Sequence, residues 1–223
     1  MNNRDTRALL FNPKTPELRM ATQLPNYGIM SGKLPPALFS KLKKEINGIE
    51  KDFKKADFFG KNLAGNIKKE YGLKKCHKDL EIFLVDVAKD YDKAFNFMKT
   101  LAYGNYDVPL FLGPLWVNFQ TKGDFNPVHR HSGVYSFVGI IKVPYTDKEI
   151  EAGPGAASNY PMSGCLQFLY NNVLGGTEDF VYLATKEDEG SFFFFPAKFN
   201  HMVYPFFSST KYRVTISGNL LLR

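Results

Sequence analysis

The first half of the chain places its hydrophobic residues at helical spacing. One stripe lies within residues 34–46, behind a pair of prolines that suit a helix entry, and consists of Leu38, Phe39, Leu42 and Ile46. A second stripe predicts a helix from about Lys78 to Leu101 that ends before Gly104 and Asn105. Its apolar face is Leu80, Phe83, Leu84, Val87, Tyr91, Phe95 and Met98. Glycines interrupt residues 57–73, so we expect a loop there with a short helical turn.

After residue 110 the pattern changes to short apolar runs separated by Gly, Pro and Asn. We expect strands at Leu115–Phe119, Tyr135–Val143, Cys165–Tyr170, Phe180–Leu183, Ser191–Phe195, His201–Pro205 and Tyr212–Leu222. Short strands with turn signals between them favour a sandwich or jelly roll over a parallel sheet. The chain is therefore predicted to be mostly β with N-terminal helices, an α+β protein. Residues 1–109 would form a helical extension that packs on a jelly-roll core of residues 110–223, within one structural domain.

Residues 145–163 are too polar and too rich in glycine to belong to a core, and they are long for a hairpin turn. Loops of this length in compact domains commonly have a function. We interpret this stretch as a lid or a substrate-recognition loop.

The net charge of +7 is confined to the N-terminal half. Residues 1–100 contain 20 lysines and arginines against 12 acidic residues, whereas residues 101–223 contain 9 against 10. This excess of positive charge could steer a nucleic acid or another polyanion towards a site. The simpler interpretation is a solvated face of amphipathic helices.

The apolar runs are too short for a membrane protein. The longest, such as Val138–Ile141 and Phe192–Phe195, fall far below the roughly 20 residues that cross a bilayer. The first twenty residues lack the apolar centre of a secretory signal, and the two cysteines, Cys76 and Cys165, have no zinc-type spacing. We therefore expect a cytoplasmic protein with reduced cysteines.

Three of the four histidines carry the clearest chemical signal. His129 and His131 are two residues apart, so in a strand both imidazoles can point to one side, and His201 follows in a distant predicted strand. Three imidazoles would occupy one face of a metal and leave the other positions open. Taken singly, each histidine also fits a solvated or a satisfied core residue.

The segments around these histidines resemble a known family. They are Trp116–His131, Ser136–Pro144, Phe194–His201 and Arg213–Asn219. In this order they are similar to the iron(II)- and 2-oxoglutarate-dependent dioxygenases. The closest likeness is to a branch common in phages and marine bacteria, whose members carry His-x-His where others carry His-x-Asp. The resemblance covers residues 110–223 and implies a double-stranded β-helix, the cupin-like jelly roll.

His131 stands where the family places an aspartate. The usual triad is two histidines and one carboxylate, so three interpretations remain open. The site is a three-histidine iron site made by His129, His131 and His201, a two-histidine site completed by water or by a carboxylate such as Asp124, or a degenerate site. We favour His131 as a ligand because the spacing is kept and imidazole suits iron.

Arg213 is the candidate for binding the co-substrate. Arg213, Thr215 and Ser217 alternate with apolar residues and so lie along one face of a strand. Taken alone, this pattern would indicate a strand face that is exposed to solvent. The resemblance implies that Arg213 and Thr215 bind the far carboxylate of 2-oxoglutarate, where a guanidinium is the better match. It also implies a hydrogen bond from Asn118.

The sequence therefore predicts an oxygenase that uses iron(II), 2-oxoglutarate and O2, and hydroxylates a substrate while 2-oxoglutarate is decarboxylated to succinate. The substrate, whether a protein side chain, a nucleobase or a metabolite, lies beyond the sequence, because specificity resides in loops. Aromatic residues that either line the pocket or form core are Tyr135, Phe137, Phe194 and Tyr204. The alternatives are a cupin-like metal dioxygenase without 2-oxoglutarate, and a non-catalytic phage-associated binding or structural protein on the same fold.

Overall fold

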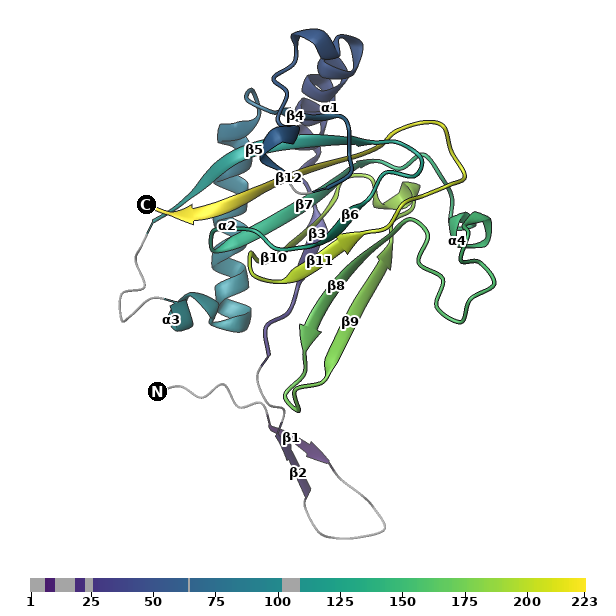
Figure 1. The fold of residues 1–223 in the computed structure, drawn as a ribbon. Helices are drawn as coiled ribbons and strands as arrows, with labels where there is room; N and C mark the ends of the chain where they lie inside the picture. Colours follow the sequence, from purple (N-terminus) through teal and green to yellow (C-terminus); the bar gives the residue numbers. More distant parts are fainter. Residues whose placement is uncertain (1–6, 11–18, 23–25, 64, 102–108) are drawn as a thin grey trace.

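Two antiparallel sheets form the centre of the computed structural model, which describes residues 7–10, 19–22, 26–63, 65–101 and 109–223 (Figure 1). The larger sheet has the strand order β3 (Met30–Lys33), β10 (Ser191–Pro196), β7 (Tyr135–Lys142), β12 (Arg213–Leu222), β5 (Leu110–Gln120) and β4 (Glu70–Gly72). The smaller has the order β6 (Asn126–His129), β11 (Asn200–Val203), β8 (Cys165–Asn171) and β9 (Thr177–Leu183). A separate hairpin pairs β1 (Arg7–Leu10) with β2 (Arg19–Thr22). This is the predicted mostly β architecture.

Helices cover the outer face of the larger sheet. The two long ones are α1 (Pro36–Lys51) and α2 (His77–Phe95), and α2 crosses behind the sheet in the view of Figure 1. Their buried residues are Leu38, Leu42 and Ile46 on α1, and Leu80, Leu84, Val87, Ala88 and Tyr91 on α2. These lie in one hydrophobic cluster with residues of β5, β7, β10 and β12. The hydrophobic stripes thus face the core as their spacing predicted.

The prediction of one helix from Lys78 to Leu101 was wrong. The helix stops at Asn96, which adopts a left-handed conformation with φ of 54°, and a short helix α3 (Phe97–Leu101) follows. Asparagine tolerates this conformation better than most residues. The Asp92 side chain accepts a hydrogen bond from the Met98 amide at 2.7 Å, which satisfies a donor at the start of the new helix.

The run of four phenylalanines on β10 supplies two different cores. Phe192 and Phe194 pack in the cluster under the helices, whereas Phe193 and Phe195 pack between the two sheets, where both lie near the Phe168 ring of β8. Successive side chains of a strand point to opposite faces. A strand that is covered on both faces is therefore apolar throughout.

The segment 57–73, predicted as a loop with a short helical turn, also contains a strand. The helical turn is η2 (Gly60–Asn62), which follows the 3-10 turn η1 (Phe53–Lys55) that precedes the segment. Glu70–Gly72 then pairs with β5 as the edge strand β4. At the opposite edge of the sheet, β3 pairs with β10. The N-terminal half thus contributes both edge strands of the larger sheet.

The glycine-rich stretch 145–163 includes a short helix, α4 (Glu149–Ala152), and is anchored by a buried acid. The Glu149 carboxylate accepts hydrogen bonds from the backbone amides of Phe207 and Ser208, and from the Ser208 hydroxyl. This segment is thus held against the loop that precedes β12. Its role as a lid stays a prediction.

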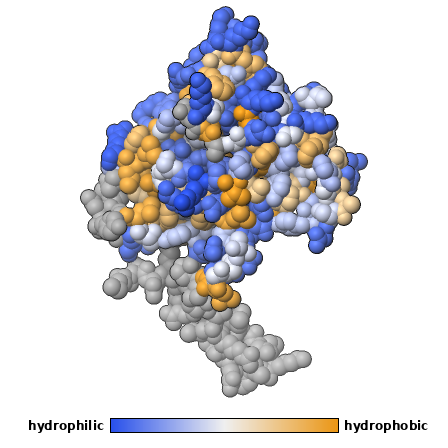
Figure 2. All heavy atoms as spheres, viewed as in Figure 1, coloured by the Kyte–Doolittle hydropathy of each residue, from blue (hydrophilic) through white to orange (hydrophobic). Residues whose placement is uncertain are grey.

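Ion pairs neutralise several lysines of the basic N-terminal half. Lys41 pairs with Asp79 at 2.6 Å and Lys74 with Asp57 at 2.9 Å, and further pairs lie along α2. Figure 2 shows hydrophilic residues gathered over the end of the molecule formed by α1. This arrangement favours a solvated helix face, and nothing in it supports nucleic-acid binding.

Two further sequence expectations concern cysteines and membranes. Cys76 and Cys165 are both buried and free. Within the described residues, no helix is long and apolar enough to cross a membrane.

Candidate metal centre and adjoining cavity

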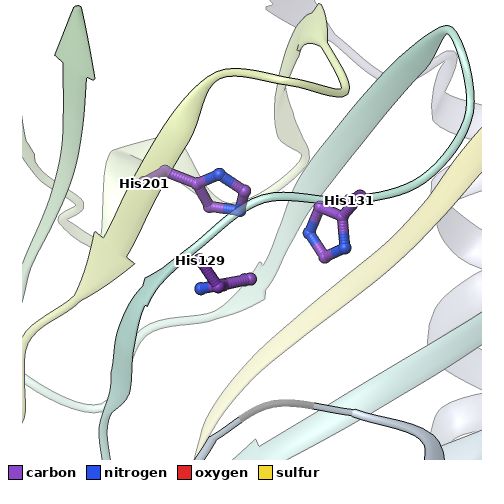
Figure 3. Close-up of side chains that lie close together, drawn as sticks. All are labelled: His129, His131 and His201. Atoms are coloured by element: carbon purple, nitrogen blue, oxygen red, sulfur yellow. The ribbon is translucent and has the colours of Figure 1, made fainter.

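Two neighbouring strands bring His129 and His201 together. His129 ends β6, His201 lies on β11, and the antiparallel register sets the two residues directly opposite each other. His131 follows β6 by two residues, and its backbone amide donates to the Ala197 carbonyl at 2.9 Å. This hydrogen bond holds the segment after β6 against the loop before β11, so that all three imidazoles converge (Figure 3).

The three rings are spaced for one small cation. Their centroids lie 4.2 Å apart for His129 and His201, and 5.0 Å apart for each pair that includes His131. Each histidine offers one ring nitrogen such that all three nitrogens lie within 4.8 Å of one another. Imidazole nitrogens coordinate divalent transition metals at about 2 Å, so donors around one ion lie a few ångströms apart.

Backbone carbonyls orient two of the rings. Nδ1 of His129 lies 2.8 Å from the Pro127 carbonyl oxygen, and Nδ1 of His201 lies 2.9 Å from the Phe199 carbonyl oxygen. In each case a protonated Nδ1 donates to the carbonyl, which leaves Nε2 as the free acceptor for a metal. Such hydrogen bonds are typical of metal-binding histidines, because they fix both the tautomer and the ring orientation.

Burial keeps two of the imidazoles neutral. Desolvation lowers the pKa of His201 to about 3 and that of His131 to about 4, and the neighbouring His129 adds to both effects. A neutral imidazole has a lone pair to share with a cation, whereas an imidazolium does not. These two donors are therefore ready to bind a metal at neutral pH, and three imidazoles suit iron(II).

No carboxylate of the described residues belongs to this cluster. Asp124, the acid considered as an alternative ligand, is turned into its own loop: Oδ2 accepts hydrogen bonds from the backbone amide and the hydroxyl of Thr121 at 2.8 and 2.7 Å. The geometry thus favours His131 over Asp124 as the third ligand.

A cavity of about 450 Å³ adjoins the histidines. Its walls include all three of them, and also Asn118, Arg213, Thr215 and Ser217 from the inner face of the larger sheet. Phe137 borders the cavity, but its side chain lies in the cluster under the helices together with Tyr135 and Phe194. Tyr135 and Phe194 pack against Tyr91 of α2. For these three aromatic residues the plain-core interpretation holds.

Arg213 is a buried cation whose hydrogen-bond partners among the described residues are all neutral. Its Nε and Nη2 donate to Oε1 of Gln120 at 2.9 and 2.8 Å, and Nη2 also donates to the Tyr204 carbonyl at 2.8 Å. Nη1 donates to the Tyr145 hydroxyl at 2.7 Å and to the Gly164 carbonyl at 2.5 Å. These bonds fix the orientation of the guanidinium but leave its charge uncompensated, although the side chain is only 5% exposed. A buried charge favours a counter-ion, and the cavity gives an anion access.

Thr215 and Asn118 lie beside each other on adjacent strands. Asn118 Nδ2 donates to the Thr215 hydroxyl at 3.2 Å, while Asn118 Oδ1 is buried without a hydrogen-bond partner. An unpartnered polar atom in a cavity wall is a contact point for a ligand. All three residues that the family resemblance implied for 2-oxoglutarate therefore line the same cavity as the histidines.

The sequence did not single out Gln120, Tyr145 or Glu70. Gln120 had a detectable signal, because Trp116, Asn118 and Gln120 alternate with apolar residues on β5 and all three line the cavity. Glu70 had none, because its strand is only three residues long. Tyr145 is brought to Arg213 by tertiary contact alone.

Comparisons with known proteins bear on the family and the fold. Residues 114–219 match the family described as "Putative 2OG-Fe(II) oxygenase". A comparison with curated proteins found no match. Among solved structures, a Pseudomonas putida prolyl-4-hydroxylase is similar with a TM-score of 0.52 and 13% identity, over 88% of this chain and 94% of the other.

AviO1 from Streptomyces viridochromogenes Tue57 is similar with a TM-score of 0.50 and 13% identity, over 87% of this chain and 90% of the other. At such low identity these two likenesses concern the fold, and they confirm the predicted jelly-roll core. The family match adds that residues 114–219 are similar to iron(II)- and 2-oxoglutarate-dependent oxygenases, a family whose metal is iron(II) and whose co-substrate is 2-oxoglutarate.

Proposed function

We propose that this protein hydroxylates a substrate that enters the 450 Å³ cavity, with 2-oxoglutarate and O2 as co-substrates and succinate and CO2 as co-products. One oxygen atom would enter the substrate as a hydroxyl group and the other would enter succinate. The observation that carries this proposal is the presence, on one cavity, of three converging imidazoles and of a buried arginine that has no acidic partner among the residues the structure describes.

In this proposal His129, His131 and His201 hold the iron(II). The metal supplies the oxygen chemistry when it is bound, and the protein supplies its geometry. Three imidazoles on one side leave the remaining coordination positions facing the cavity. The ligand set carries no negative charge, so an anionic co-substrate would be the first group to neutralise the cation.

Arg213 would bind the far carboxylate of 2-oxoglutarate, helped by the Thr215 hydroxyl and by the second Nδ2 hydrogen of Asn118, while Asn118 Oδ1, which only accepts, stays free. The guanidinium is already fixed by Gln120 and by backbone carbonyls, so little side-chain freedom is lost on binding. The Tyr145 hydroxyl accepts from Arg213 and donates to the Gly164 carbonyl at 3.2 Å, so it also helps to fix the guanidinium. The charge-assisted contact would then compensate the buried cation.

The two rival functions fit these observations less well. A metal dioxygenase without 2-oxoglutarate has no use for a buried arginine on the wall of its cavity. A non-catalytic protein with a decayed site has no need to keep three imidazoles converging, two of them oriented by backbone carbonyls. Both rivals remain distinguishable by experiment.

The decisive test is an anaerobic titration with iron(II) and then 2-oxoglutarate, followed by exposure to air and measurement of succinate. We expect stoichiometric iron binding, 2-oxoglutarate binding that depends on iron, and succinate formation over a substrate panel. Iron binding without any affinity for 2-oxoglutarate would instead support the metal dioxygenase that does not use it. Absence of iron binding would support the non-catalytic protein.

A further inference from the structure

Glu70 is a buried carboxyl group that the proposed reaction does not use. It lies on the edge strand β4 and is 3% exposed, yet within the described part of the chain its carboxyl forms no hydrogen bond and no ion pair. Among the described residues that line the cavity, it is the only acidic one. A buried carboxyl without a partner is costly, so its position calls for an explanation.

The strand register aims Glu70 into the cavity. Glu70 lies opposite Asn118 on β5, and Asn118 lies opposite Thr215 on β12. Residues opposite each other in antiparallel strands project from the same face. The adjacent Lys69 projects from the other face, where its ammonium contacts the Tyr212 hydroxyl and the Phe53 ring. Lys69 therefore cannot neutralise Glu70.

Two unpartnered acceptors lie on neighbouring strands at this point. They are the Glu70 carboxyl and Oδ1 of Asn118, which is buried without a hydrogen bond. Neither of the two arginines that line the cavity, Arg130 and Arg213, forms an ion pair with Glu70. Burial together with the nearby Asp124 raises the pKa of Glu70 to about 7. These observations describe a site whose missing partner is a hydrogen-bond donor, and a cationic donor would suit it best.

The adjacent wall is aromatic and aliphatic. Phe59 stacks on Trp116 with ring centroids 5.7 Å apart, and Leu63 and Ile67 continue the lining. Aromatic faces attract cations, and tryptophan does so most strongly. An apolar wall beside a carboxylate suits an alkyl chain that ends in an ammonium group.

We propose that Glu70 and Asn118 form the recognition site for a protonated aliphatic amine on the primary substrate, whose alkyl part lies along Phe59 and Trp116. This proposal rests on the proposed function, since it names the chemical class of the group that the cavity receives. The amine is thereby held at the β4 side of the cavity, and the rest of the substrate extends towards the histidines.

Glu70 is a recognition residue in this proposal and not a metal ligand. It lies outside the group of ligating atoms formed by the three histidines. Replacement of Glu70 should therefore leave iron affinity unchanged. A role in metal binding would show itself as a loss of iron from Glu70→Gln.

The test measures binding of three small probes, n-butylammonium, 1-butanol and butyrate, to the anaerobic protein loaded with iron(II) and 2-oxoglutarate at pH 8. Calorimetry or ligand-observed NMR would supply the affinities. We expect butylammonium to bind about tenfold or more tightly than butanol, because a charged hydrogen bond is added, and butyrate to bind most weakly at this site. Equal affinity for butylammonium and butanol in the wild-type protein would overturn the proposal without any variant.

Two variants locate the binding site. Glu70→Gln should lose at least about nine-tenths of the affinity for butylammonium and keep that for butanol, whereas Glu151→Gln, at an exposed acid on α4, should change neither. Butylammonium binding that survives Glu70→Gln intact would place the amine elsewhere and refute the proposal.

The metal-deficient variant His129→Ala separates this proposal from the proposed function. If Glu70 receives the amine, His129→Ala should still bind butylammonium, although it no longer binds iron. Loss of amine binding in His129→Ala would mean that the amine coordinates the metal, and the proposal would be wrong. Conversely, a wild-type protein that forms no succinate but binds butylammonium through Glu70 would refute only the proposed reaction.

Discussion

His129 and His201 are 72 residues apart in the sequence but face each other across β6 and β11, with their ring centroids 4.2 Å apart. The register of this strand pair thus creates the first two corners of the candidate metal site. The third candidate ligand, His131, is held there by the hydrogen bond from its backbone amide to the Ala197 carbonyl at 2.9 Å.

Removal of either histidine of the strand pair should abolish metal binding. We expect His129→Ala and His201→Ala to lower iron(II) affinity by about 100-fold or more, since even the residues that support metal ligands contribute 10- to 100-fold. Anaerobic calorimetry would measure this. The control is His77→Ala, because His77 bonds the Gly113 carbonyl at 2.9 Å outside the cavity and should leave the affinity unchanged. Unchanged affinity in His129→Ala would exclude the proposed centre.

The role of His131 can be tested by a pair of substitutions. His131→Asp should retain or raise iron(II) affinity, because an anionic oxygen partly neutralises the divalent ion. His131→Ala should lose affinity if His131 is a ligand. Equal affinities in the wild-type protein and both variants would remove His131 from the site.

Arg213→Ala should weaken 2-oxoglutarate binding by about 2–5 kcal/mol, the usual loss when one partner of a buried charge pair is removed, and leave iron content almost unchanged. The variant also loses bonds to Gln120 and Tyr145, so its melting temperature should fall. Arg213→Lys, which keeps the charge but not the fork of donors, should bind 2-oxoglutarate with intermediate affinity. A lowered melting temperature with full 2-oxoglutarate affinity would assign Arg213 a purely structural role.

Glu70→Gln should stabilise the protein at high pH. The pKa of Glu70 is raised from 4.5 to about 7 in the folded state, so the folded protein holds a proton that the unfolded chain has lost. The contribution of Glu70 to the free energy of unfolding is therefore fully present below pH 4.5 and is lost as the pH rises through 7. We expect Glu70→Gln to exceed the wild type by about 1–3 kcal/mol at pH 8 and by much less at pH 5. Urea unfolding at both pH values measures the difference, and a less stable variant at pH 8 would reveal an ion partner of Glu70.

Asn96 should tolerate glycine but not alanine. Its φ of 54° lies in the left-handed region, where a Cβ is strained and glycine is not. Asn96→Ala should lower the free energy of unfolding by about 1 kcal/mol, and Asn96→Gly by less or not at all. Denaturant unfolding of the two variants in parallel is the measurement. Equal losses in both would indicate that the Asn96 side chain, and not the backbone conformation, stabilises the junction of α2 and α3.

Local pattern in the sequence already indicated most of the elements and the candidate chemistry. The stripe of Leu38, Leu42 and Ile46 indicated α1 because a helix repeats every 3.6 residues, and the alternation of Arg213, Thr215 and Ser217 indicated a strand because side chains alternate every two. The spacing of His129 and His131 pointed to a metal for the same reason. Only tertiary structure decided which strands pair, because pairing is made by contacts between distant segments.

Pairing set His201 opposite His129, and it turned Glu70, in a segment without periodicity, towards the cavity beside Asn118. It also surrounded Arg213 with Gln120, Tyr145 and Gly164, which lie far from it in the chain. The helix break at Asn96 is invisible to an apolar stripe that continues through Met98, since a backbone dihedral angle leaves hydrophobic spacing unchanged. The sequence therefore determined which groups this protein has, and the packing of distant strands decided what each of them faces.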